Sequence, residues 1–178
     1  MRYGRDIKFT EKPLLLTIDN AYLLNSFSCG NEVMDEHIRN SANDLATVTK
    51  MFVDTDNDSV VCVYSLSCSS MIIESGEKHY PAPAVEIKTF AVDTTYQNIP
   101  YSEDYEDGVL SDWIFSVVIG EILSFTDDIC GANLVLLYST DEGEQFYRRN
   151  GFMDFIETAW RDNDRYLDGC TPLYLRIR

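Results

Sequence analysis

The chain has 178 residues, of which 45% are hydrophobic and 25% charged, so it is long enough for one globular domain with a buried core and is not a disordered chain. Its formal net charge of -16 argues against general nucleic-acid binding, because phosphate contacts need clustered lysine and arginine. The charge favours a basic partner or a strongly solvated acidic surface.

The amino-terminal part of the chain predicts a strand and a helix. The segment MRYGRDIKF has no apolar stretch of the kind found in signal peptides, so we expect a cytoplasmic protein in which residues 1–12 are loosely held. Residues 13–18, PLLLTI, predict a short buried strand. In residues 31–45 the apolar positions recur at spacings of 4, 4 and 3, which indicates one face of a helix.

A hairpin and further strands follow. Residues 47–54 are rich in β-forming side chains, and the next residues, DTDND, favour a turn. Residues 60–73 alternate and predict a long strand. Residues 76–83 are polar and contain one glycine and two prolines, so they predict a loop before a strand over residues 84–92.

The second half alternates helices with strands. Residues 110–125 predict a well-buried helix, and residues 133–139 predict a buried strand. Residues 141–150 predict a short helix with an acidic first turn and a basic last turn, and Gly151 is placed to cap its end. Final strands are predicted at residues 152–155 and 173–176. This order predicts an α+β fold with a mixed, partly parallel sheet flanked by helices.

The sequence gives little support for a metal site or for a membrane partner. The five cysteines lack CxxC spacing, and their odd number and scatter predict reduced, mostly buried thiols. Cys62 and Cys68 are separated by an even number of positions along the predicted strand, so we expect them to pack on the same face of it. His37 and His79 have no ligand partners at metal spacing, so no metal is expected. No apolar run approaches the ~18 residues that span a bilayer, and we expect no membrane partner.

The carboxyl-terminal tail contains three aromatic residues. They are expected in the core or in a subunit contact, such as that of a homodimer: Trp160, Tyr166 and Tyr174. Residues 162–168 predict a solvated turn. The chain contains no GxSxG segment, so serine-hydrolase chemistry is not expected.

Three segments together resemble the GNAT superfamily of acetyl-CoA-dependent N-acetyltransferases. FYRRNGF, residues 146–152, is similar to the (F/L)Y-x-x-x-GF ending of the family. FSCGNEVMDEHIRNSA, residues 27–42, is similar to the opening of a branch that includes the toxins of bacterial toxin–antitoxin pairs and their bacterial and phage relatives. VEIKTFAVD supplies the strand between them. The resemblance covers most of residues 13–156 and implies a single GNAT-like domain over residues 1–178.

The resemblance implies acetyl transfer from acetyl-CoA to a primary amine of a protein or small molecule. Tyr147 matches the tyrosine that usually protonates the leaving thiolate, and a phenol of pKa about 10 suits that role; alternatively, Tyr147 only packs behind Phe146. Glu86 matches a general base found in some histone-acetylating members. Its alternative reading is an exposed strand acid paired with Lys88, and the toxin branch generally lacks this base.

The resemblance also places the cofactor. In the family, the strand that contains Phe90, Ala91 and Val92 pairs its backbone with the pantetheine arm, and it splays from the strand at residues 134–138 to open a V-shaped slot. Since backbone pairing is insensitive to side chains, this expectation does not depend on their identity.

The phosphate-binding loop departs from the family pattern. The family signature is (Q/R)-x-x-G-x-(G/A), whose amides at a helix start hold the pyrophosphate. The segment YQN begins like it, and Asn98 is able to replace the first glycine, because Asn tolerates a left-handed backbone. An acidic insertion over residues 98–109 follows, and the amide nest would move to Gly108, Val109 and Leu110.

The insertion carries four carboxylates, Glu103, Asp104, Glu106 and Asp107. Each opposes a phosphate by about 1 kcal/mol if unscreened, and the helix dipole contributes a similar amount in favour. We therefore expect acetyl-CoA binding that is weakened, unless the insertion folds away as a surface flap.

Two alternatives stay open. One is a degenerate GNAT fold that acts as an acidic binding or decoy protein. The other is a toxin that acetylates aminoacyl-tRNA and is held by a small basic antitoxin, although the net charge of -16 opposes a tRNA partner.

Overall fold

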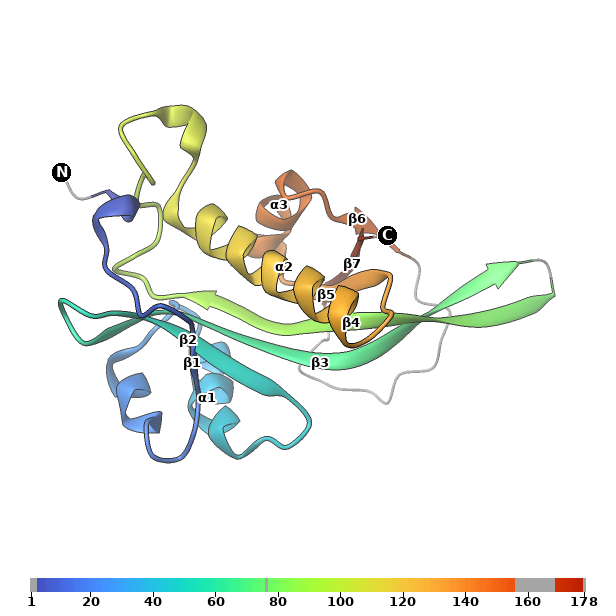
Figure 1. The fold of residues 1–178 in the computed structure, drawn as a ribbon, viewed down its shortest axis with the longest axis horizontal. Helices are drawn as coiled ribbons and strands as arrows, with labels where there is room; N and C mark the ends of the chain where they lie inside the picture. The colour runs from blue at the N-terminus through green and yellow to red at the C-terminus, as the bar shows by residue number, and fades with distance from the viewer. Residues whose placement is uncertain (1–2, 76, 156–168, 178) are drawn as a thin grey trace. The chain divides into compact units, whose positions relative to one another are not determined.

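The structure is a computed structural model that describes residues 3–75, 77–155 and 169–177. Its strands form a seven-stranded sheet in the order β1-β2-β3-β4-β5-β7-β6 (Figure 1). The strands are β1 (Leu14–Leu15), β2 (Val48–Asp54), β3 (Ser59–Ser75), β4 (Lys78–Val92), β5 (Leu134–Ser139), β6 (Met153–Asp154) and β7 (Thr171–Arg176). The helices are α1 (Glu32–Asn40), α2 (Leu110–Asp128) and α3 (Asp141–Arg149). Short 3-10 turns lie at η1 (Gly4–Asp6), η2 (Ala21–Ser26), η3 (Ser41–Asn43) and η4 (Tyr105–Asp107).

The sheet is mixed, as predicted. β4 and β5 run parallel, whereas β1 and β2, β2 and β3, β5 and β7, and β6 and β7 pair in antiparallel fashion. A parallel pair requires a crossover connection, and α2 provides it between β4 and β5. The α+β class with a partly parallel sheet is therefore confirmed.

The chain divides into two compact units. The first contains Met1–Leu66 and Thr89–Gly120, and the second contains Ser67–Lys88 and Glu121–Arg178. β3, β4 and α2 each continue from one unit into the other. The prediction of one domain over the whole chain stays a prediction.

The core of the first unit is built on both faces of β2. Met51 and Val53 pack in one cluster with Ile38 of α1. Phe52, which is offset by one residue, contacts Phe9 edge-on at a ring distance of 5.9 Å. A bulge near Phe52 in the β2–β3 pairing and burial on both faces explain why β3 does not alternate as expected: Val60, Val61, Cys62, Val63 and Tyr64 are all buried.

The amino-terminal segment is held more closely than expected. Ile7 is buried, and Phe9 stacks on Trp113 of α2 at a ring distance of 5.5 Å. Trp113 also stacks on Tyr101 at 5.6 Å. The backbone of Lys8 accepts a hydrogen bond from the Thr55 amide. Two apolar side chains in a polar stretch thus anchor residues that sequence composition alone suggested were loose.

Three element predictions are wrong in part. The buried strand predicted over residues 13–18 is only the two-residue strand β1, and Leu15 and Ile18 are exposed. The predicted helix over residues 31–45 ends at Asn40 and continues only as the 3-10 turn η3, after which Asp44 is extended and Leu45 is fully exposed. The predicted loop over residues 76–83 is largely the start of β4. A proline lacks only the amide donor, so it is tolerated in a strand where that amide would face away from the partner strand.

The second unit contains the buried strand β5, as predicted. Leu134 and Leu136 pack with Ala84 of β4, and Tyr174 of β7 lies against this cluster. Trp160, Tyr166 and the turn predicted over residues 162–168 lie outside the described residues. None of the described helices is both long and apolar enough to cross a membrane.

Candidate functional site

The last residues of β4 are fixed by packing on both faces. The Phe90 ring contacts Phe115 of α2 at 5.0 Å, whereas Ala91, on the opposite face, belongs to the α1 cluster. Val92 is also buried. The described rungs between β4 and β5 run from Ala84–Leu134 to Ile87–Leu137. The predicted pantetheine-binding residues therefore lie on a rigid strand, beyond the described parallel rungs.

The turn after β4 begins at Asp93, whose carboxylate is buried. Asp93 Oδ1 accepts hydrogen bonds from the amide and the hydroxyl of Thr95, at 2.9 and 2.6 Å. Asp93 Oδ2 accepts from the amide of Ser28 at 3.0 Å. One carboxylate thus joins the end of β4 to the segment that precedes α1.

The FSCG opening motif is a structural turn. Asp35 of α1 is buried; its Oδ1 accepts from the Cys29 amide at 2.8 Å, and its Oδ2 accepts from the Ser28 hydroxyl at 2.7 Å. Burial alone would raise the pKa of Asp35, but these hydrogen bonds, with a smaller effect of Arg39, hold that pKa below its ordinary value. Phe27 is a core residue. This motif therefore shapes the entry to α1.

The YQN segment has the shape expected of a loop start. The Tyr96 hydroxyl donates to the buried carboxylate of Asp54 at 2.9 Å. Gln97 Nε2 donates to two carbonyls, those of Val92 at 2.9 Å and Cys29 at 3.0 Å. Asn98 has φ of 56°, so the prediction that it adopts the left-handed conformation of a glycine is confirmed.

The insertion closes on itself at its base. The Leu110 amide donates to the Ile99 carbonyl at 2.8 Å, and the Tyr101 amide donates to the Gly108 carbonyl at 3.0 Å. Gly108 has φ of 70°, which lets the chain turn into α2. The Pro100 carbonyl accepts from the Gly4 amide of η1, and the Tyr101 carbonyl accepts from the Arg5 amide. The insertion is therefore tied to the amino-terminal segment.

The predicted amide nest at Gly108, Val109 and Leu110 is partly engaged within the protein. The Leu110 amide binds Ile99, and the Val109 amide faces Asp112 Oδ2 at 3.4 Å. Asp112 lies in the first helical turn, where carboxylates favour amides and the helix dipole. Sequence reasoning missed Asp112, although its position near the start of the helix is typical of a capping residue. The nest remains a prediction that requires these amides to change partners.

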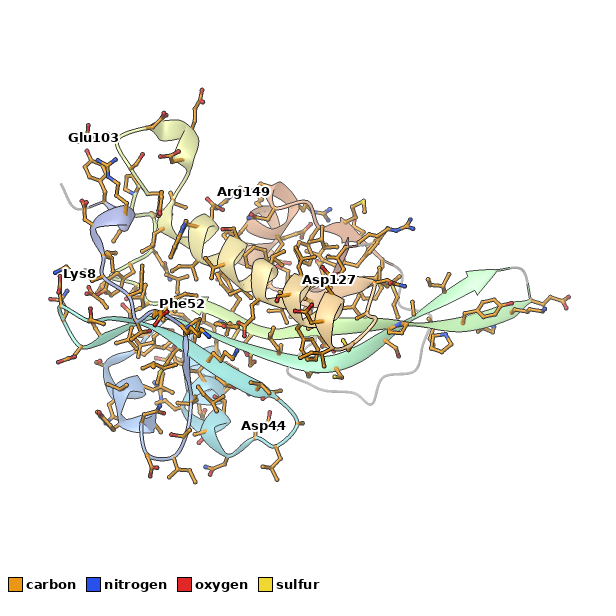
Figure 2. All side chains as sticks on the ribbon, viewed as in Figure 1. Lys8, Asp44, Phe52, Glu103, Asp127 and Arg149 are labelled. Atoms are coloured by element: carbon orange, nitrogen blue, oxygen red, sulfur yellow. The ribbon has the colours of Figure 1, made fainter. Side chains whose placement is uncertain are left out.

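The acidic side chains of the insertion lie at the surface. Glu103, Asp104, Glu106 and Asp107 are exposed, and Figure 2 shows Glu103 on the outer part of the loop. Hydrogen bonds within the loop also hold it together: the Glu106 amide donates to Asp104 Oδ1, and the Ser102 hydroxyl donates to Asp107 Oδ2. The carboxylates thus stay in solvent, where salt screens them.

Tyr147 lies in the last part of α3, half-buried, in the second unit. Its ring contacts Phe146 and Phe152 edge-on, at 5.2 and 6.0 Å. A Cβ added at Gly143, one turn earlier, would lie 3.3 Å from the Tyr147 ring. The glycine therefore lets the phenol ring lie close to the helix backbone, and both readings of Tyr147, packing and catalysis, fit this position.

The FYRRNGF motif also ends α3. Gly151 has φ of 89° and donates its amide to the Arg148 carbonyl, and the Phe152 amide donates to the Tyr147 carbonyl. These two bonds form the Schellman motif, so the predicted glycine cap is confirmed. Arg148 then pairs with both Glu144 and Asp154, which ties the helix to β6.

Gly151→Ala is expected to destabilise the protein by about 1–2 kcal/mol, because an L side chain disfavours the left-handed backbone. The added Cβ would meet Leu175 only at 3.6 Å, an ordinary contact, so the loss would come from the backbone alone. Urea unfolding measures it. Gly131→Ala is the control, since a Cβ there meets nothing within 4 Å. Equal stability of the two variants would contradict the assignment of Gly151 as the left-handed cap of α3.

Glu86 lies on β4 in the second unit and is buried, not exposed as its alternative reading assumed. Its carboxylate pairs with Lys88 Nζ at 3.0 Å, which agrees with the other part of that reading. The ion pair therefore gives Glu86 a structural partner on its own strand.

The thiols and candidate metal ligands do not form a site in the described part of the chain. All five cysteines are free; Cys62 is buried, Cys68 is exposed and the others are half-buried, so the expectation of mostly buried thiols is wrong. Burial raises the pKa of the Cys29 thiol to about 11, and Asp35 adds to the shift. The described residues contain no group of three histidines, cysteines or carboxylates arranged to hold a metal.

Comparison with known proteins identifies the fold. Neither a protein-family model nor a curated protein matches the sequence. A solved bacterial toxin matches with a TM-score of 0.69 and 16% identity, over 96% of this chain and 92% of its own. AtaTR bound with acetyl-CoA matches with 0.69 and 14%, over 93% and 92%. AtaT complexed with acetyl-methionyl-tRNAfMet matches with 0.66 and 16%, over 95% of each chain. The chain therefore has the GNAT fold of these toxins, as its motifs predicted.

Proposed function

We propose that the protein is an N-acetyltransferase that transfers an acetyl group from acetyl-CoA to a primary amine of a protein or small molecule. The observation that carries the proposal is the turn after β4, where a rigid strand leads through Gln97 to a left-handed Asn98. This geometry is present although the following residues depart from the family signature. The fold similarity to AtaTR bound with acetyl-CoA supports it.

The proposed reaction is direct transfer. The amine nitrogen attacks the thioester carbonyl carbon, a C–N bond forms, and the C–S bond breaks. From a neutral amine, one proton leaves the nitrogen and one reaches the departing thiolate of CoA; an acceptor that starts as an ammonium ion must first lose a further proton to the base. The residues must therefore supply an acceptor for the first proton and a donor for the second.

We assign the proton donor to Tyr147. A neutral phenol has a proton to give at physiological pH, whereas a phenylalanine at this position has none. A tyrosine-to-phenylalanine variant of the AtaT toxin has been solved with the C-terminus of the antitoxin AtaR and acetyl-CoA, and it shares this fold with a TM-score of 0.66. That similarity supports the choice of a tyrosine for this role.

We assign the proton acceptor to Glu86, directly or through water. Glu86→Gln is then expected to lower kcat/KM about 100-fold at pH 7, because the amine is no longer deprotonated by the enzyme. The loss should shrink at pH 9, where more of the acceptor amine is already neutral. A pH–rate profile of the two proteins measures this.

Lys88→Gln is the matched control for Glu86→Gln. It breaks the same ion pair and leaves the carboxylate in place. If Glu86 is only structural, the two variants will lose activity alike at every pH, and the assignment of the base fails.

We assign the pantetheine arm to the backbone of Phe90, Ala91 and Val92, and the pyrophosphate to the loop that starts at Asn98. The residues Gly108, Val109 and Leu110 would join it only after the Leu110 amide leaves Ile99. An amide that already has a backbone partner must exchange one hydrogen bond for another, so its net contribution to the binding free energy of the pyrophosphate is small. Weakened binding is therefore expected, and not abolished binding.

A thiol-release assay tests the function directly. The protein is mixed with acetyl-CoA and a set of primary amines, and free CoA is measured together with the mass of each amine. The proposal predicts CoA release in step with a gain of one acetyl group on at least one amine. Hydrolysis of acetyl-CoA without an acetylated amine would contradict it.

A second candidate is a toxin held by an antitoxin. AtaT has been solved bound to the C-terminus of the antitoxin AtaR, and the net charge of -16 on this chain suits a basic partner. The same charge opposes docking of tRNA, so we favour a protein or small-molecule acceptor. Growth arrest on expression that Tyr147→Phe abolishes would support a toxin, whereas arrest that persists would favour an inactive binding protein.

A further inference from the structure

Two buried carboxylates, Asp35 and Asp93, hold one short turn from two sides. The turn is Ser28–Cys29, before α1. Asp35 binds the Cys29 amide and the Ser28 hydroxyl, and Asp93 binds the Ser28 amide. Their side chains come from residues that are distant in the sequence. The motif before α1 and the motif after β4 are therefore one physical unit.

Further bonds join the same two segments. The Thr94 amide donates to the Ser28 carbonyl at 2.9 Å, and Gln97 Nε2 donates to the Cys29 carbonyl at 3.0 Å. The carbonyl of Asp93 accepts from the amides of Tyr96 and Gln97, at 2.8 and 3.1 Å. The residues from 93 to 97 thus have their backbone direction set by contacts with the segment before α1.

Asp93 occupies the centre of this arrangement. One of its oxygens faces Ser28 and the other faces Thr95, and each accepts from a backbone amide. Burying a carboxylate costs free energy unless hydrogen-bond donors satisfy its oxygens. The donors around Asp93 meet this condition, and they also fix the orientation of the two segments that supply them. An asparagine has the same shape, but its NH₂ group would point at an amide donor in either orientation.

We infer that Asp93 is a positioning residue for acetyl-CoA, which holds the turn of residues 93–98 in the shape that receives the pyrophosphate. The inference rests on the proposed function. The turn lies between the strand assigned to pantetheine and Asn98, at which the phosphate loop starts, so its shape sets the direction of the amides that follow. Pantetheine alone needs only the strand.

The test compares two donors that differ by the phosphates. Acetyl-CoA carries the pyrophosphate and S-acetyl-pantetheine lacks it, so calorimetry with both separates the turn from the strand. Asp93→Asn is expected to weaken acetyl-CoA about tenfold, the equivalent of one charged hydrogen bond, and S-acetyl-pantetheine by less than about twofold. Amide hydrogen exchange at Thr95, Tyr96 and Gln97 should become faster in the same variant without ligand.

Two further variants keep the test decisive. Gln97→Ala removes the bonds to Val92 and Cys29 from an exposed side chain, so it should fold even if Asp93→Asn does not, and it should show the same preference between donors. Asp44→Asn is the control: both its oxygens also accept hydrogen bonds, from Ala46 and Thr47, in a turn away from the proposed site (Figure 2). It should bind both donors as the wild type does.

The outcomes separate the inference from the proposed function. If the wild type binds acetyl-CoA and Asp93→Asn and Gln97→Ala weaken both donors equally, or neither, the positioning role is overturned and the function stands. If the wild type binds neither donor, the proposed function fails and the inference with it. A loss confined to acetyl-CoA supports the positioning role and the acetyl-CoA binding on which it rests, and the thiol-release assay then tests the transfer.

Discussion

Tyr147→Phe is expected to lower kcat about 100- to 10,000-fold, the usual contribution of a positioned proton donor. Without the hydroxyl, the departing thiolate has no acid beside it and must take its proton from water. The affinity for acetyl-CoA should not change, because the aromatic contacts of the ring with Phe146 and Phe152 are kept. Steady-state kinetics and calorimetry on the same protein measure both quantities.

Tyr174→Phe is the matched control for this change. Tyr174 lies on β7 of the same unit, its ring contacts Phe155 edge-on at 6.3 Å, and the family resemblance gives it no catalytic or cofactor-binding role. It should retain nearly full activity. If the Tyr147 variant also retains its activity, Tyr147 is a packing residue, and another group must protonate the thiolate.

Glu103→Lys combined with Glu106→Lys is expected to bind acetyl-CoA about tenfold more tightly at low salt, because two repulsive carboxylates near the phosphates become attractive. Both side chains are exposed, so folding should not suffer. The gain should fall towards zero as salt is added, because the Debye length shrinks to about 3 Å at 1 M. Calorimetry at several salt concentrations measures this dependence.

The control variant changes the net charge of the chain by the same amount, but on α1 and not in the insertion. Glu32 and Glu36 are exposed on α1, and Glu32→Lys with Glu36→Lys shifts the charge of the chain by the same amount. If this control tightens acetyl-CoA as strongly as the insertion variant, the insertion has no special relation to the phosphates. An unchanged affinity in the insertion variant would place the phosphates away from the loop.

The parts of the fold that were predictable from sequence depend on local chemistry. Gly151 and Asn98 both adopt the left-handed backbone that their residue types permit, and both were predicted. The buried strand β5 was equally clear from its unbroken apolar run. Each of these features is encoded within a few consecutive residues, and sequence patterns report such features well.

The parts that sequence missed depend on contacts between distant residues. The amino-terminal segment reads as polar, and only the stacking of Phe9 on Trp113 shows why it is held. The Asp93–Ser28 bond joins residues 65 positions apart. The prolines of β4 indicated a loop because their tolerance in a strand depends on the direction of an amide. No local pattern carries this information.

The candidate site was likewise predictable from sequence only in part. The motif resemblance predicted Tyr147 as a candidate donor, which stays a prediction, and a left-handed turn at Asn98, but it did not show that the Leu110 amide donates to the Ile99 carbonyl or that the Val109 amide faces Asp112. These contacts arise because the insertion closes on itself, and an insertion has no counterpart in the family signature. The phosphate end of the site is therefore the least predictable part.

The central claim is that this chain still binds acetyl-CoA, and calorimetric titration of the full chain with acetyl-CoA tests it most directly. The account predicts saturable binding with one site per chain and a Kd below about 1 mM, an affinity of roughly 4 kcal/mol or better. The affinity should increase when Glu103 and Glu106 are reversed in charge. An absence of heat at millimolar acetyl-CoA, in both the wild type and that variant, would contradict the account.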